Sequence, residues 1–406
     1  MLGRQSGSGE DMAGLRMKPR DDFEICIVGG GATGWAAALA AAEAGRTTAI
    51  IAPPATFPIG RTAALFAGSI ELLEQFGAMP DLVSAAAPLQ AMRLIDDTGR
   101  LIRAPEVTFY AGEIGLNVFG YNIPNRRLVE ALSERARNSR YITIFEDTAS
   151  ELSFQPDCVH ITTGRGTLLK SDLVVGADGA RSLVRDKTGI AVRRWRYAQS
   201  ALVTTLSVTQ PHHSVSTEFH TDRGPFTLVP MQGNNVSLVW VERPREASLL
   251  CEIPEEEFAR RAERSAHSLL GAMQVTSPRV SYPLSAGLAD RFASGRALLI
   301  GEAAHIFPPI GAQGLNLGLR DVEALKTVLS LNRNRLDEGT ATEFHRLRQI
   351  DVRSRTLAVD LLNRSLLTGL LPVQALRAIA LSAAGGFAPF RRFLMQQGLA
   401  KTFQGL

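Results

Sequence analysis

The sequence predicts a mixed α/β fold in which two domains interleave along the chain. Two short apolar runs, 23–28 and 47–52, enclose a glycine cluster and an alanine-rich stretch, which is the order of a βαβ unit. Residues 197–243 alternate apolar and polar side chains between turn signals, a pattern typical of an antiparallel sheet. A further buried strand at 296–301 precedes a helix over about 314–330. Strands flanked by helices therefore lie on both sides of the sheet-rich region.

The remaining elements follow from local patterns. We expect helices at 69–77, 125–138 and 255–270, strands at 141–145, 158–163 and 171–176, and strand-like pieces within 91–122. The chain after residue 341 is expected to be helical, with breaks at 371–372 and 385–386.

Composition limits the function classes. The 44 basic residues exceed the 40 acidic ones by four, and no basic stretch is interleaved with aromatics, so nucleic acid is not an expected partner. The three cysteines form no CxxC pair, which argues against a zinc site and favours a reducing cytoplasm. We expect residues 1–20 to be a disordered extension, since they lack the apolar core of a signal peptide. No apolar run reaches the roughly 20 residues of a membrane span.

The first βαβ turn carries a dinucleotide-binding pattern, Gly29-x-Gly31-x-x-Gly34. In such a turn the first glycine permits the tight bend, the second lets the backbone approach a pyrophosphate, and the third lets the helix pack on the strand. The helix start adds N–H groups and a partial positive charge. The alternative is a glycine-rich turn without a ligand. The acidic residue that usually grips the ribose is missing, because the second strand ends at Ala52.

Two further motifs lie at strand ends. Residues 172–185 read DLVVGADGARSLVR and deliver Asp178 and Gly179 into a turn, although Asp-Gly is also a common surface turn. Residues 300–321 read IGEAAHIFPPIGAQGLNLGLRD. There the strand is expected to end at Gly301, so that Glu302 can accept hydrogen bonds from sugar hydroxyls. The following helix start can stabilise a developing negative charge. A structural Gly/Pro loop is the alternative.

In this order, the three motifs resemble the single-component flavoprotein aromatic hydroxylases, the relatives of p-hydroxybenzoate hydroxylase. GRTAAL at 60–65 and GPFTLVPMQGNNVSLVW at 224–240 resemble the branch of that family that makes ubiquinone. The resemblance covers the chain except for residues 1–20 and Ala52. It implies FAD as cofactor, NAD(P)H as electron donor, O2 and an aromatic, polyprenylated phenol as substrates, and ring hydroxylation through a flavin C4a-hydroperoxide. No metal is expected.

The resemblance also implies roles for individual residues. Pro308 and Pro309 are expected to line the oxygen and substrate side, and His305 is a candidate catalytic base, with a structural hydrogen bond as the favoured alternative. Arg61 is expected beside the pyrophosphate or adenosine. The full set of expected FAD-binding residues is Gly29, Gly31, Ala32, Thr33, Gly34, Arg61, Asp178, Gly179, Glu302, Gly311, Ala312, Gln313, Gly314, Leu315 and Asn316.

The domains implied are a Rossmann-like FAD-binding domain interleaved with an antiparallel-sheet substrate domain and followed by C-terminal helices. The FAD-binding domain is expected to comprise 21–90, 123–195 and 286–340, the substrate domain 91–122 and 196–285, and the helical region 341–406. The arginine-containing helices at 360–394 are expected either to pack on the body or to touch the inner membrane or a ubiquinone-biosynthesis complex.

Three other functions stay open at this point. The same fold serves hydroxylases of soluble aromatic acids or secondary metabolites, and it also serves flavin reductases and halogenases. The WxWxIP segment of the halogenases is absent from this sequence, which argues against that activity. A non-catalytic FAD-binding redox module is the alternative outside enzymes.

Overall fold

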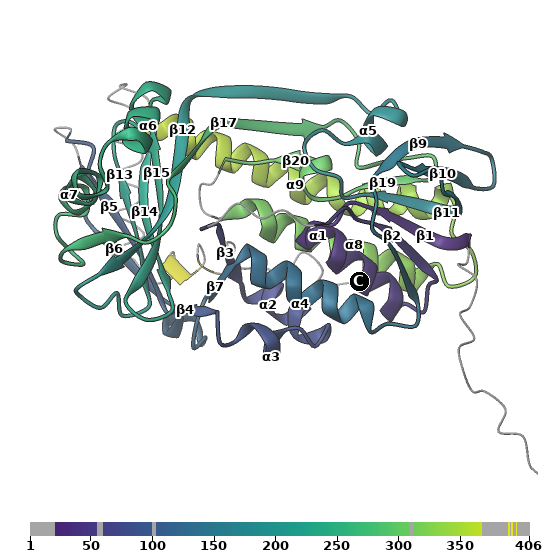
Figure 1. Cartoon of the computed structure of the whole chain (residues 1–406), viewed down its shortest axis with the longest axis horizontal. Helices are drawn as coiled ribbons and strands as arrows, with labels where there is room; N and C mark the ends of the chain where they lie inside the picture. The colour runs from purple at the N-terminus through teal and green to yellow at the C-terminus, as the bar shows by residue number, and fades with distance from the viewer. Residues whose placement is uncertain are drawn as a thin grey trace, which may run out of the picture.

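The computed structural model describes residues 21–54, 60–99, 103–308 and 312–367, and also residues 389, 391, 392 and 395. For residues 355–367 it describes the backbone only. Strands gather into two large sheets and one small sheet, and helices pack around and between them (Figure 1). The predicted mixed α/β class is confirmed. Pro309, Gly311, residues 1–20 and the helix breaks predicted near 371 and 385 lie outside the described residues.

The first sheet is mainly parallel and has the order β18-β19-β11-β1-β2-β8, with β10 and β9 attached beyond β11. Its central strands are continuous buried apolar runs, as expected where helices cover both faces of a parallel sheet. The strands are β1 (Asp22–Val28), β2 (Thr48–Ile51), β8 (Ile142–Phe145), β9 (Ala149–Phe154), β10 (Val159–Thr163), β11 (Leu168–Gly176), β18 (Ala293–Ser294) and β19 (Ala297–Leu299).

The second sheet has the order β20-β17-β12-β15-β14-β13-β5-β6, with β16 paired to β12. The predicted antiparallel pairing holds for its neighbours except β5 and β13, which run parallel. In Figure 1, β12 and β17 extend side by side from this sheet toward the first one. The strands are β5 (Ala91–Asp96), β6 (Val107–Tyr110), β12 (Val192–Val208), β13 (Val215–His220), β14 (Pro225–Met231), β15 (Asn235–Glu242), β16 (Met273–Val275), β17 (Val280–Ala289) and β20 (His305–Ile306).

A small antiparallel sheet, β3 (Thr62–Phe66), β7 (Gly120–Pro124) and β4 (Ala87–Leu89), completes the strands. The helices are α1 (Ala32–Glu43), α2 (Ala67–Gln75), α3 (Met79–Leu82), α4 (Asn125–Arg137), α5 (Leu183–Lys187), α6 (Pro244–Glu252), α7 (Glu255–Ser265), α8 (Gln313–Leu331) and α9 (Glu338–Leu367), with short 3-10 turns η1 (Ala111–Ile114) and η2 (Gly301–Ala303).

The main core surrounds α1. Every residue of this helix from Gly34 to Ala42 is buried, because α1 packs against β1 and β2 as well as α4 and α8. Its alanines explain this position, since small side chains let neighbouring elements approach from all sides. A second core lies under α6 and α7, on the antiparallel sheet. Near the chain end, Arg391 pairs with Glu113 at 2.6 Å, and Met395 is buried beside Phe119.

Some boundaries differ from the expectation. Helix α7 ends at Ser265 rather than 270, because His267 and Ser268 adopt left-handed backbone conformations. The predicted domain limits at 195/196 and 285/286 fall inside β12 and β17, so the domain division itself stays a prediction. None of the described helices is long and apolar enough to cross a membrane.

Candidate functional site

The first glycine turn has the shape that a dinucleotide needs. Gly29 has φ +119, and a Cβ there would overlap the carbonyl oxygen of Ala177. A Cβ on Gly34 would overlap the carbonyl oxygen of Gly29, so α1 packs directly on the turn. In contrast, a Cβ on Gly31 would meet nothing within 4 Å. The turn is therefore closed on the protein side and open in front of the helix start.

The three sequence motifs meet at this helix start. The first motif touches the second, since a Cβ on Gly29 would lie 2.9 Å from the backbone nitrogen of Asp178. The third motif touches Thr33, whose Oγ1 would lie 3.3 Å from a Cβ on Gly301 and 2.8 Å from one on Gly318. Three segments far apart in the sequence thus pack together at the beginning of α1.

Asp178 combines a structural contact with an unused oxygen. Its Oδ2 accepts hydrogen bonds from the backbone nitrogens of Leu183 at 2.7 Å and Val184 at 3.2 Å. Its Oδ1 is buried without a partner among the described residues. Burial raises the pKa of this carboxyl above its usual range. Gly179 follows at φ +77 with open space around it. An orphaned buried acceptor beside an open turn fits a site that binds a polar ligand.

Helix α8 begins at a second open start. Ala312 caps it in the left-handed conformation, φ 53 and ψ 32, which is uncommon for a residue with a side chain and recurs at functional sites. Gly314 is exposed, and a Cβ there would meet nothing within 4 Å. Gln313 and Leu315 are half-buried on either side. The first N–H groups of α8 have no partner within the helix, so they are suited to an electron-rich ligand atom.

Asn316 uses its side chain inside the protein. Its Oδ1 accepts from the backbone nitrogen of Phe66 at 3.0 Å and from the Ser69 hydroxyl at 2.8 Å. Its Nδ2 donates to the carbonyl oxygens of Ala64 at 2.8 Å and Ala312 at 2.7 Å. The amide therefore ties β3 and α2 to the start of α8, and a contact of Asn316 with a flavin stays a prediction.

Glu302 and His305 occupy different environments. Strand β19 ends at Leu299, two residues earlier than expected, and Glu302 lies exposed in η2. His305 is buried, with its Nε2 2.7 Å from Asp321 Oδ2. This is the structural contact considered for His305, and a catalytic role stays a prediction. Pro308 is buried at the end of the same segment.

Asp321 is the centre of a buried ionic cluster. Its Oδ2 also accepts from the backbone nitrogen of Gly301 at 2.8 Å, and its Oδ1 accepts from Arg348 Nε at 2.7 Å. Arg348 in turn pairs with Asp351 at 2.7 Å. Burial alone would raise the pKa of Asp321, but the interactions with His305 and Arg348 outweigh it and lower that pKa. The cluster joins η2, α8 and α9.

Arg61 and Ala52 are the two residues expected near the adenosine half. The Arg61 guanidinium lies 4.0 Å from the ring centroid of Tyr282 in β17, a cation–π contact with the antiparallel sheet. Its predicted place beside the pyrophosphate stays a prediction. Ala52 is buried directly after β2, and a Cβ on Gly30 would lie 2.7 Å from its methyl group. Ala52 therefore offers no polar side-chain atom at the ribose end of the turn.

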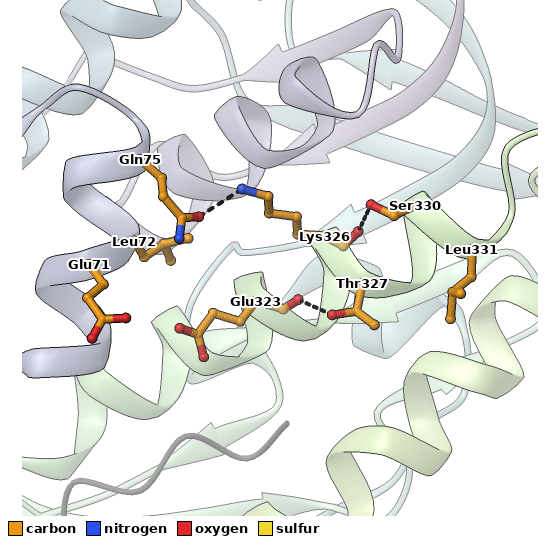
Figure 2. Close-up of a pocket in the computed structure, with 8 residues that line it drawn as sticks. All are labelled: Glu71, Leu72, Gln75, Glu323, Lys326, Thr327, Ser330 and Leu331. Atoms are coloured by element: carbon orange, nitrogen blue, oxygen red, sulfur yellow. Dashed lines mark hydrogen bonds between the residues drawn. The ribbon is translucent and has the colours of Figure 1, made fainter. Parts of the chain in front are cut away.

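A separate pocket lies between α2 and the C-terminal half of α8 (Figure 2). Its volume is about 450 Å³, and Lys326 crosses one side to reach Gln75 at 2.8 Å and Glu43 at 2.6 Å. The lining residues are Glu71, Leu72, Gln75, Glu323, Lys326, Thr327, Ser330 and Leu331. None of them belongs to the predicted site, and the pocket lies at the opposite end of α8 from Ala312.

Sequence reasoning missed several residues that hold the site together. Arg185 is buried and donates to the carbonyl oxygens of Ala180 at 3.1 Å and Ala303 at 3.0 Å, which joins the second motif to the third. Arg185 is the last residue of the second motif, and Asp321 is the last residue of the third. A charged residue after an apolar helical turn was the sequence feature that could have identified them. Arg348 carried no signal, because only the fold brings it to Asp321.

Known proteins are similar to this chain over most of its length. The model of the FAD binding domain family matches residues 22–342. The ubiquinone hydroxylase UbiL of Rhodospirillum rubrum is 32% identical over 387 residues, covering 93% of this chain and 89% of the relative. The 3-demethoxyubiquinol 3-hydroxylase of Escherichia coli is 30% identical over 390 residues, covering 93% of this chain and 98% of the relative.

Solved structures share the fold. The p-nitrophenol 4-monooxygenase PnpA of Pseudomonas putida has a TM-score of 0.77 at 21% identity, covering 94% of this chain and 99% of that one. HpxO of Klebsiella pneumoniae, solved with FAD and uric acid, has a TM-score of 0.74 at 16% identity, covering 93% and 97%. At these identities the likeness shows the fold alone.

Proposed function

The chain belongs to the FAD binding domain family, and from that premise we propose that it hydroxylates the aromatic ring of a polyprenylated phenol on the route to ubiquinone. It is an FAD-dependent monooxygenase. The single observation that supports the substrate is the likeness to ubiquinone hydroxylases over 93% of the chain, which includes the antiparallel sheet as well as the nucleotide-binding elements.

The start of α1 would hold the FAD pyrophosphate. Its first N–H groups have no partner within the helix, and the open space at Gly31 lets phosphate oxygens approach the backbone. Asp178 borders the same turn through its backbone nitrogen, so it would help to shape the nucleotide site. The residues present therefore fit a dinucleotide.

The start of α8 would face the flavin ring. A reduced flavin bound there would bring its negative charge near the first turn of α8, where the helix dipole favours that charge. Bound FAD supplies the redox chemistry, because it accepts electrons from NAD(P)H or another donor and activates O2 for insertion of one oxygen atom. Pro308, buried at the end of the segment that follows β20, would help to exclude water.

His305 is proposed to position this segment rather than to react. Its bond to Asp321 fixes β20, which leads directly into the Phe307–Pro308 segment. Asn316 does the same from the other side, because its amide joins β3 to the first turn of α8. Both residues would keep the two helix starts at a constant separation.

The substrate is tested by complementation. The chain is expressed in bacterial strains that each lack one ring-hydroxylation step of ubiquinone synthesis, and quinones are identified by mass. We expect ubiquinone to return in at least one strain. The product of the missing step should contain one more oxygen atom than the intermediate that the strain accumulates, and this atom should be ¹⁸O when ¹⁸O2 is supplied. A Gly31→Ala variant serves as the matched control. Failure in every strain by a yellow, FAD-loaded protein would reject the prenylated substrate and favour a soluble aromatic acid.

A prenylated substrate also implies a membrane contact. The prenyl chain partitions into the bilayer, so we propose that the protein touches the membrane surface peripherally to collect it. Flotation with liposomes tests this contact. We expect the protein to float with vesicles that contain a polyprenyl quinone, and recovery only in the bottom fraction under all lipid compositions would contradict it.

A further inference from the structure

We propose that the indole N–H of Trp35 replaces the missing acidic residue and donates a hydrogen bond to a ribose hydroxyl of the adenosine half of FAD. This assignment rests on the proposed function, since it concerns the cofactor of that same site. In βαβ dinucleotide sites the hydroxyls of this ribose meet a carboxylate at the end of the second strand. Here that place is Ala52, directly after β2.

Ala52 offers no polar side-chain atom, and its surroundings offer few. Its backbone N–H already donates a hydrogen bond to the carbonyl oxygen of Phe145 at 3.0 Å. Pro53 and Pro54 follow, and neither has a backbone N–H to donate. The position that a carboxylate usually occupies is therefore lined by a methyl group and two residues without donors.

Trp35 brings a polar atom to that place. It follows the third glycine of the motif on α1, and it is buried with 5% of its surface exposed. Its Nε1 would lie 3.7 Å from a Cβ on Gly30, and the Ala52 methyl would lie 2.7 Å from the same point. The indole nitrogen and Ala52 thus flank one spot at the glycine turn.

The indole N–H has no other use in the part of the chain that the structure describes. No hydrogen bond joins it to a described residue, and it is not among the fully enclosed polar atoms that lack partners. The indole nitrogen is therefore not fully enclosed by protein. A buried tryptophan normally finds a partner for its N–H, so an unused donor at this spot points to the ligand.

The two residues are complementary in size and in chemistry. A carboxylate would accept hydrogen bonds from ribose hydroxyls, whereas the indole only donates, so a hydroxyl oxygen becomes the acceptor. The small Ala52 leaves room for the large ring, and Gly30 leaves room for both. The contact is neutral, so the ribose is held without a negative charge near the pyrophosphate.

The assignment is tested by removing the two partners of the hydrogen bond in turn: the indole N–H from the protein and the ribose hydroxyls from the ligand. The full-length chain is stripped of flavin, and the binding of ADP and of 2′,3′-dideoxy-ADP is measured by calorimetry. For the wild type we expect the dideoxy ligand to bind about three- to tenfold more weakly, the range of one hydrogen bond. For Trp35→Phe, which keeps an aromatic ring but lacks the N–H, we expect the two ligands to bind equally.

Two further variants separate this contact from a general effect on packing. Trp240→Phe makes the same change in the core of the antiparallel sheet, where the rings of Trp240 and Phe226 pack edge to face with centroids 5.0 Å apart, and it should keep the wild-type preference. Adding Ala52→Glu to Trp35→Phe supplies the usual carboxylate and should restore the preference for ribose hydroxyls.

The outcomes distinguish this assignment from the proposed function. If wild type and Trp35→Phe prefer ADP over its dideoxy analogue by the same factor, the role of Trp35 is rejected while FAD binding stands. If the purified chain binds neither FAD nor ADP, both FAD as its cofactor and the proposed function are rejected.

Discussion

At the residue scale, the glycines of the first turn separate folding from binding. Gly34 lies against the backbone of Gly29, whereas Gly31 faces open space. Both replacements add one methyl group, yet that group would meet protein in one case and the ligand in the other. This contrast makes the pair a sharper test of the nucleotide site than removal of any charged side chain.

We expect Gly31→Ala to fold with wild-type stability but to lose most of its FAD, because the methyl group occupies the space in front of the helix start. We expect Gly34→Ala to unfold more easily by about 1–3 kcal/mol or more, because the backbone must shift. Thermal unfolding of the apoproteins and FAD titration measure the two effects. A Gly31→Ala protein that binds FAD as tightly as the wild type would place the pyrophosphate elsewhere.

At the element scale, the cluster at Asp321 connects three segments that the chain separates widely. It receives the backbone of Gly301 from η2, His305 from β20, and Arg348 from α9. Asp321→Asn keeps the shape but leaves the guanidinium of Arg348 with less opposing charge in a buried place. We expect the free energy of unfolding to fall by about 3–5 kcal/mol, the usual effect of breaking a buried pair.

The control is Asp81→Asn, which makes the same change in a surface pair with Arg135 and should cost at most about 1 kcal/mol. Urea denaturation measures both. Because folding lowers the pKa of Asp321, its contribution is present above the unfolded pKa of about 4 and is lost as pH falls toward the folded value. The gap between wild type and Asp321→Asn should therefore narrow in acid, and a gap that does not change with pH would contradict the pairing.

Sequence patterns correctly predicted the elements whose geometry depends on residues close to one another in the sequence. The βαβ turn at Gly29, the strand pattern of 197–243 and the helix start near 313 all follow from local spacing, and the structure has them. Patterns failed where the partner is distant. The parallel pairing of β5 with β13 and the contact of Arg348 with Asp321 depend on the whole fold.

The site shows the same division. Local sequence predicted that Gly31 lets a ligand approach the backbone, and a Cβ on Gly31 would indeed meet nothing within 4 Å. It placed Glu302 at a strand end, but β19 stops at Leu299, where the chain turns into η2 so that the backbone of Gly301 reaches Asp321. Asp321 stands 20 residues later, at the far end of the same motif, and nothing in the motif shows that its side chain accepts a hydrogen bond from Gly301.

At the scale of the whole molecule, the segment before β3 touches the antiparallel sheet in two places. The Arg61 guanidinium stacks on Tyr282, and a Cβ on Gly60 would lie 2.8 Å from the hydroxyl oxygen of Ser277. If binding of the FAD pyrophosphate draws the Arg61 guanidinium away from the tyrosine ring, the two contacts compete. The contact with Tyr282 would then reduce the apparent affinity for FAD.

This competition predicts that removal of a side chain strengthens the binding of FAD. Tyr282→Leu removes the ring and should tighten FAD binding about two- to fivefold, since a cation–π contact at a partly exposed site contributes about 0.5–1 kcal/mol. Tyr282→Phe keeps an aromatic face and should bind FAD as the wild type does, while Arg61→Ala should weaken binding. Quenching of flavin fluorescence on titration into apoprotein measures all three. Unchanged or weaker binding by Tyr282→Leu would mean that Arg61 stays on the antiparallel sheet, so that its role is to join the two sheets rather than to hold the cofactor.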